Sequence, residues 1–214
     1  MTSLIKDISI QVELGISSEL GFRRIEPGIL TRSETPLVLA WLGLNQGKRG
    51  ACIEINPVVG VRNQEVEHVI SDLLSEPRSE HVPPSISANI GYLSSARRYK
   101  CYLFDGARDN FVANMDLMVQ DIRGVGYPFI VAMTNIACLI ENLQSPRFHT
   151  GQAIYRVLVG LCLLNRKEEA ELQIAVTAAK LDSRTDEAAK RMIRFIIALG
   201  RRFDLRVYLQ SSMM

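Results

Sequence analysis

Residues 36–61, PLVLAWLGLNQGKRGACIEINPVVGV, decide the fold of this chain. Two apolar runs, rich in Val, Ile and Leu, flank a polar segment at 45–50 that is rich in Gly, Asn and Lys. This pattern predicts a β-hairpin with strands at 37–44 and 51–59. Pro57 predicts that the second strand ends there or runs along an edge, because proline cannot donate a backbone hydrogen bond.

The chain before the hairpin predicts one helix and one short strand. The apolar residues of 3–20 lie at helical spacing, although they also alternate as in a strand. We favour the helix, because the stretch is long and is followed by a glycine, Gly21. Residues 22–32 then predict a short strand with a turn at Pro27-Gly28.

The chain after the hairpin predicts a helix at 64–74 and a second hairpin, with strands at 86–93 and 99–104. Asn89 and Gly91 interrupt the first of these strands. A glycine at such a place indicates a bulge or the close approach of another backbone.

The second half of the chain predicts helices only. Their ranges are 109–123, 128–143, 149–164, 167–181 and 185–203, with a break at 124–126. Because the turns between them are short, we expect neighbouring helices to be antiparallel. The predicted fold class is therefore α+β. A mainly antiparallel sheet of about five strands, covered by helices, occupies residues 1–106, and a helical subdomain at 107–214 packs on it.

Composition indicates a globular protein with no strong preference for a charged partner. The chain has 214 residues, of which 47% are hydrophobic and 22% are charged, and its formal net charge is +2. This charge gives no general reason to expect nucleic acid or an anionic membrane. Residues 146–214 carry 12 Lys/Arg against 7 Asp/Glu, whereas the first 145 carry 13 against 16. We expect the acidic front and the basic tail to attract each other.

The cysteines and the apolar runs predict a cytoplasmic location. The four cysteines lie far apart within apolar runs, which indicates buried thiols in a reducing compartment and neither a disulfide framework nor a zinc site. No signal peptide is evident, and no uncharged apolar run approaches the roughly 20 residues that a membrane span needs.

Motifs for catalysis are missing. The patterns H-E-x-x-H, C-x-x-C and G-x-S-x-G do not occur, so we assign no catalytic residue, no metal ligand and no cofactor. The order helix, three strands, helix, strand resembles the core of restriction-endonuclease-like nucleases. Those enzymes hold Mg²⁺ with an acidic residue on the second strand and Asp/Glu-x-Lys on the third. The third-strand motif would be Glu54-x-Asn56, without lysine, and residues 22–53 contain no Asp.

Charged residues give the candidate binding site. The helix at 64–74 presents an acidic face, and two arginines precede the strand at 99–104, which begins with a tyrosine. Cations beside an aromatic ring can bind phosphates or stack a base, and they can also protect a strand edge. The candidate binding residues are Glu54, Glu65, Glu67, Asp72, Arg97, Arg98 and Tyr99.

Three stretches together resemble a known family. They are LGFRRIEPGILTR at 20–32, SISANIGYL at 85–93 with the later YPF at 127–129, and RKEEAELQIAVTAAKLDSRTDEAAKRMIRFI at 166–196. The family is an uncharacterised bacterial one, with a small α+β domain and a helical tail. It is similar in layout to immunity proteins that neutralise toxins exchanged between bacteria. The resemblance implies a cytoplasmic bacterial protein that works by binding, and it transfers no site residues.

The sequence therefore predicts a non-enzymatic protein-binding module, an immunity or adaptor protein in bacterial conflict, with another protein as its partner. The alternative is a protein that acts on nucleic acid. It would be a degenerate or active nuclease that uses Glu54 and the basic C-terminal helix at 185–203. A third hypothesis is a homo-oligomer formed through an open sheet edge, and the oligomeric state is left open.

Overall fold

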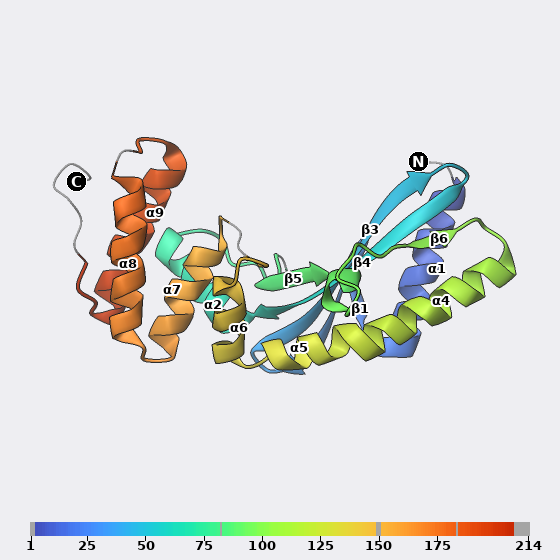
Figure 1. Ribbon diagram of the computed structural model, residues 1–214, viewed down its shortest axis with the longest axis horizontal. Helices are drawn as coiled ribbons and strands as arrows, with labels where there is room; N and C mark the ends of the chain where they lie inside the picture. The colour runs from blue at the N-terminus through green and yellow to red at the C-terminus, as the bar shows by residue number, and fades with distance from the viewer. Residues whose placement is uncertain (1–2, 82, 149–150, 183, 208–214) are drawn as a thin grey trace. The chain divides into compact units, whose positions relative to one another are not determined.

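The computed structural model describes residues 3–81, 83–148, 151–182 and 184–207. Its six-stranded antiparallel sheet and its helices confirm the predicted α+β class (Figure 1). The strands are β1 (Arg23–Glu26), β2 (Ile29–Thr35), β3 (Val38–Arg49), β4 (Cys52–Asn63), β5 (Ile86–Asn89) and β6 (Tyr102–Phe104). The helices are α1 (Ser3–Leu20), α2 (Gln64–Leu74), α3 (Ile90–Leu93), α4 (Arg108–Asp121), the π-helix η1 (Ile122–Gly126), α5 (Tyr127–Met133), α6 (Ile136–Gln144), α7 (Ala153–Leu163), α8 (Lys167–Leu181) and α9 (Glu187–Phe203).

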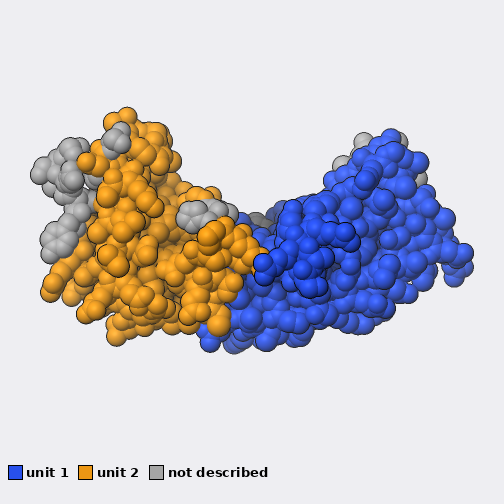
Figure 2. Space-filling model, viewed as in Figure 1, with its two compact units in different colours: residues 1–63, 81–135 blue, residues 64–80, 136–214 orange. Residues whose placement is uncertain are grey.

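The chain divides into two compact units (Figure 2). Unit 1 contains residues 1–63 and 81–135, and unit 2 contains residues 64–80 and 136–214. This division differs from the boundary expected at residue 106. Helix α2 packs on α7 and α9, whereas α4 packs on α1 and β6, so α2 belongs with the later helices and α4 with the sheet.

The β3–β4 hairpin is confirmed, but its strands are longer than predicted. The ladder runs from the pair Val38–Asn63 to the pair Arg49–Cys52, so the polar segment at 45–49 is strand and the turn follows it. Gly50 occupies that turn with φ 64°, which favours glycine. Helix α1 supports the polar strand end, because Ser9 Oγ donates to Gln46 Oε1 at 2.6 Å.

Pro57 lies inside β4, which does not end there as predicted. It pairs with Leu44, whose N–H donates to Gly28 O on the side away from β4. Both backbone groups of a residue in an antiparallel ladder point to the same side, so the backbone of Pro57 points away from β3. The ladder between β3 and β4 therefore loses no hydrogen bond at this proline.

The predicted second hairpin is wrong. Strands β5 and β6 do not pair with each other in the described sheet; both pair with β4, at its residues 58–61 and 53–55 respectively. Pro57 lies in the stretch of β4 between these two partners. The predicted close approach at Gly91 is confirmed, because a Cβ there would lie 2.1 Å from Arg98 O.

Helices follow the predicted ranges with two corrections. The break expected at 124–126 is instead η1, which joins α4 directly to α5. Gly126 lets this π-helix approach the sheet, since a Cβ there would lie 3.1 Å from a Val59 methyl group. The helix expected at 128–143 is interrupted at Thr134-Asn135, between α5 and α6. The start expected for the next helix, at 149–150, lies outside the described residues.

The two faces of the sheet differ. Side chains such as Leu42, Ile55 and Val59 are buried on one face, which we call the helix face. Helices α1, α4 and α5 pack on this face (Figure 1). We call the other face the open face. It carries the alternate residues of β4, including Glu54 and Asn56, which are only partly buried.

Unit 2 is a bundle of helices with a buried ion pair. The rings of Tyr155 and Phe195 meet edge to face, with centroids 4.7 Å apart. Arg156 Nε lies 2.6 Å from Glu67 Oε1, and each side chain is only 8% exposed. This ion pair is therefore part of the interior of the bundle.

Candidate binding site on the open face of the sheet

Glu54 lies on the open face. In β4 it pairs with Gly47 of β3 on one side and with Leu103 of β6 on the other. Alternation along the strand turns the side chains of Ile53 and Ile55 towards the helices and the Glu54 carboxylate away from them. This carboxylate is 22% exposed.

A chain of polar contacts holds Glu54 and Tyr99 together. The Tyr99 hydroxyl donates to Glu54 Oε1 at 2.8 Å, and it accepts a hydrogen bond from Asn56 Nδ2 at 2.8 Å. Arg49 lies on the other side of the carboxylate, with Nη1 3.7 Å from Oε2. Two predicted site residues that are 45 positions apart in sequence therefore meet at one place.

Burial and the Glu54 charge keep the nearby groups protonated. Burial raises the pKa of Tyr99, and the hydrogen bond to Glu54 raises it further. Burial likewise raises the pKa of the Cys101 thiol, and the charge of Glu54 adds to this effect. A cysteine acts as a nucleophile through its thiolate, so this environment disfavours covalent chemistry at Cys101.

Asn89 holds the backbone around the site in place through hydrogen bonds from both ends of its side-chain amide. Its Nδ2 donates to Asn56 Oδ1 at 2.8 Å, to Pro57 O at 3.3 Å and to Lys100 O at 3.0 Å. Its Oδ1 accepts hydrogen bonds from the backbone N–H groups of Gly91 and Lys100. The Asn89 side chain thus connects three backbone segments: β4 at Pro57, α3 at Gly91, and the residue Lys100 that precedes β6. At Pro57 it binds the carbonyl group, because this proline has no N–H to donate.

The segment before β6 presents Arg97 and Arg98 to solvent. Arg97 has φ 46°, in the left-handed region, and its N–H donates to Ser94 O at 3.1 Å. Both arginines are exposed, and Tyr99 beside them is 47% exposed. Arg97, Arg98, Tyr99 and Glu54 therefore belong to one region of unit 1.

The other predicted site residues belong to unit 2, where two of the three are engaged in ion pairs. Glu67 forms the buried pair with Arg156. Asp72 binds Arg78 at 2.8 Å and Arg202 at 3.4 Å, and these arginines lower its pKa. Glu65 is exposed.

The expected attraction between acidic and basic segments is visible in the same unit. Arg202 of α9 reaches Asp72 of α2, and Arg191 of α9 lies 2.6 Å from Glu76 Oε1. Because α9 turns these cations towards the acidic segment, part of its positive charge is neutralised within unit 2.

Sequence reasoning missed several residues of the open face. Asn56 could have been found, because alternation in a strand places it on the same side as Glu54. Asn89 had a weaker signal, since it marked an irregular strand without indicating a bridging side chain. Arg49 was assigned to the turn, so its place beside Glu54 was not predicted.

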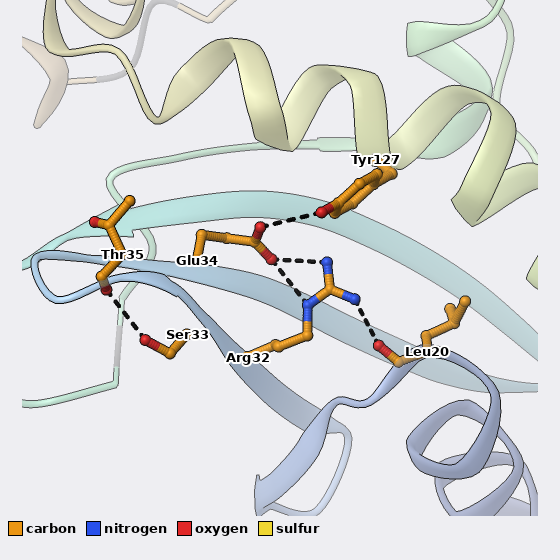
Figure 3. A network of polar contacts seen from close by, with 6 residues as sticks. All are labelled: Leu20, Arg32, Ser33, Glu34, Thr35 and Tyr127. Carbon is orange, nitrogen blue, oxygen red and sulfur yellow. Dashed lines mark hydrogen bonds and ion pairs between the residues drawn. The ribbon is translucent and has the colours of Figure 1, made fainter.

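A second polar network lies on the helix face and is structural (Figure 3). The Arg32 guanidinium lies 4.8 Å from the Tyr127 ring centroid and 5.1 Å from that of Phe22. It donates to Glu34 Oε1 and to Leu20 O, and Tyr127 donates to the other Glu34 oxygen. These contacts join α1, β2 and α5. They satisfy the Arg32 guanidinium, so a charged side chain can lie on the helix face of the sheet.

A groove of about 300 Å³ lies between α1 and α4. Gly15, Met115 and Val119 line it, and an ion pair between Glu19 and Arg123 lies at one end.

Among the described residues, no three His, Cys, Asp or Glu side chains come together as a metal site. Across the same residues, no single helix is both long and apolar enough to cross a membrane, although the bent pair at 108–133 and 136–144 meets the criterion jointly.

Comparisons with protein-family models, with curated proteins and with solved structures found no match. The similarity to immunity proteins therefore stays a prediction from the sequence.

Proposed function

We propose that this protein is a non-enzymatic binding module whose open sheet face contacts another protein. The observation that carries the proposal is the exposed ring of Tyr99, fixed by hydrogen bonds to Glu54 and Asn56. Tyrosine and arginine are enriched among the residues that dominate binding energies, and a ring held before binding loses less conformational entropy. An immunity or adaptor role is the form of binding that the sequence resemblance implies.

Nucleic-acid processing is the second candidate, and the geometry favours it less. The polar groups that the structure places against Glu54 are Tyr99, Arg49 and the Cys101 thiol, whereas a Mg²⁺-dependent nuclease would need further carboxylates at that point. The cations of α9 that reach Glu76 and Asp72 are already neutralised. Both observations support a protein partner over a phosphate backbone.

The test begins with affinity capture from the source organism. A captured protein is then purified, and its affinity for the wild type is compared with that for Tyr99→Ala by calorimetry. Leu172→Ala is the matched control, because Leu172 is 63% exposed and lies in unit 2. We expect Tyr99→Ala to weaken binding by about 1–2 kcal/mol, or about 5- to 30-fold, and the control to bind like the wild type.

A cleavage assay gives the opposing outcome. If the purified protein cuts DNA or RNA in the presence of Mg²⁺ and Glu54→Ala abolishes the cutting, the protein is a nuclease and the binding proposal is wrong.

A further inference from the structure

The loop between α3 and β6 holds two arginines whose charges are not neutralised within the described chain. Over the described ranges, neither Arg97 nor Arg98 has a carboxylate within ion-pairing distance, and both are exposed. Their neighbours differ, because Arg49 lies beside Glu54 and Lys100 forms an ion pair with Asp121. The unpaired positive charge of this region is therefore concentrated at the tip of one loop.

The end of the loop that leads into β6 is fixed before any partner binds. Asn89 accepts from the Lys100 N–H and donates to the Lys100 carbonyl, and the Tyr99 hydroxyl is bound by Glu54. The absence of a side chain at Gly91 allows the backbone at 98–100 to pack against α3. A loop held in this way presents its side chains with little further ordering on binding.

We infer that this loop binds an acidic segment of the partner protein, with Arg97 and Arg98 as its charge contacts and the exposed rings of Tyr92 and Tyr99 beside them. The inference rests on the proposed function and names the chemistry of its partner. Charge complementarity supports it, since a guanidinium can donate two parallel hydrogen bonds to one carboxylate, so two adjacent arginines suit two acidic side chains. Tyr99 is 47% exposed and follows the two arginines directly in sequence. Tyr92 is 46% exposed and lies in α3 next to Gly91, against which the backbone at 98–100 packs.

The number of free cations decides against nucleic acid as the occupant. Two arginines can contact about two phosphates. Raising the salt concentration from about 50 to about 200 mM would then weaken single-strand binding only about sevenfold, whereas a protein that makes about 6–10 phosphate contacts loses about 10³- to 10⁵-fold.

Nuclear magnetic resonance of the ¹⁵N-labelled full chain tests the inference with three probes: hexaglutamate, hexaglutamine and a thymidine hexanucleotide. We expect millimolar hexaglutamate to shift the amide signals of 94–100 and the Nε–H signals of Arg97 and Arg98, and hexaglutamine to leave them unchanged. The double variant Arg97→Glu with Arg98→Glu should lose these shifts. Lys180→Glu with Arg201→Glu makes the same charge change in unit 2 and should keep them.

Three results would overturn the inference: hexaglutamate shifts that persist in the double variant, no shifts at millimolar hexaglutamate, or tighter binding of the hexanucleotide than of hexaglutamate. The captured partner separates this failure from that of the proposed function. If the double variant binds that partner like the wild type while Tyr99→Ala binds it weakly, the open face is the binding site and the arginine loop is not.

Discussion

Asn89→Ala should destabilise unit 1 more than an ordinary polar truncation. The substitution removes an 8% exposed side chain that makes five hydrogen bonds, four of them to backbone groups of 57, 91 and 100. The three shortest of these backbone contacts, to Gly91 N, Lys100 N and Lys100 O, are 2.9–3.1 Å long, and these groups would lose a partner in a partly or wholly buried place. At about 1 kcal/mol for each such group, the free energy of unfolding should fall by about 3 kcal/mol.

The measurement is denaturant unfolding followed by tryptophan fluorescence. Trp41 is the only tryptophan of the chain and lies in β3, so its emission reports on unit 1. Asn45→Ala is the matched control, because Asn45 is an exposed asparagine of the same sheet, and we expect a change within about 0.5 kcal/mol. If Asn89→Ala costs less than about 1 kcal/mol, water replaces the amide and the bridging role assigned to it is wrong.

Three further predictions concern other parts of the chain. Arg156→Met should lower the free energy of unfolding of unit 2 by about 3–5 kcal/mol, because it leaves the buried Glu67 carboxylate without this arginine. Adding Glu67→Met to the same chain should restore most of the lost stability. Circular dichroism follows the unfolding, and equal losses in the single and the double variant would contradict this account. Gly91→Ala should cost about 1–3 kcal/mol in the Trp41 assay, since its Cβ would lie 2.1 Å from a backbone oxygen, and a stability equal to that of the wild type would show that the loop is free to move. The pKa of Asp186 is lowered to about 2 from 3.8 by its hydrogen-bonded arginine, so its stabilisation is present above pH 3.8 and is lost as the pH falls towards 2. The stability difference between the wild type and Asp186→Asn should shrink over that interval, and a difference independent of pH would refute the assignment.

Local patterns were sufficient for most elements of the fold. Apolar spacing located α1 and α2, and the glycine after Leu20 marked the end of the first helix. The core of the β3–β4 hairpin was equally clear from its Val, Ile and Leu runs. Each of these signals is contained within a short stretch, where the period of the side chains decides the structure.

The errors came from positions where a distant segment changes the meaning of a local signal. Polar residues at 45–49 indicated a turn, yet they form strand, because β4 continues the ladder and Ser9 of α1 contacts Gln46. Pro57 indicated a strand end or an edge, yet it lies inside β4, and its backbone points to the side where neither β5 nor β6 pairs with this residue. Neither fact follows from the residues nearby.

The candidate site was predictable residue by residue and not as an arrangement. Glu54 and Tyr99 were each selected for their chemical type. Their hydrogen bond depends on β6 pairing with β4 across almost fifty residues, which no local pattern specifies. Glu67 was selected as part of an acidic surface, and only the position of Arg156 in α7 shows that this carboxylate is buried.

The membership of α2 in unit 2 has a consequence for synthesis on the ribosome. Its buried residues Val66 and Val69 pack in a bundle with α7 and α9, and α7 begins only at Ala153, roughly 80 residues further along the chain. At about 5–20 residues per second, about 4–16 s pass between the synthesis of α2 and the start of α7, the first of these two partners. During that interval the nascent chain exposes the apolar face of a helix that lies in sequence between two strands of the sheet, and this face is a surface that a co-translational chaperone can cover.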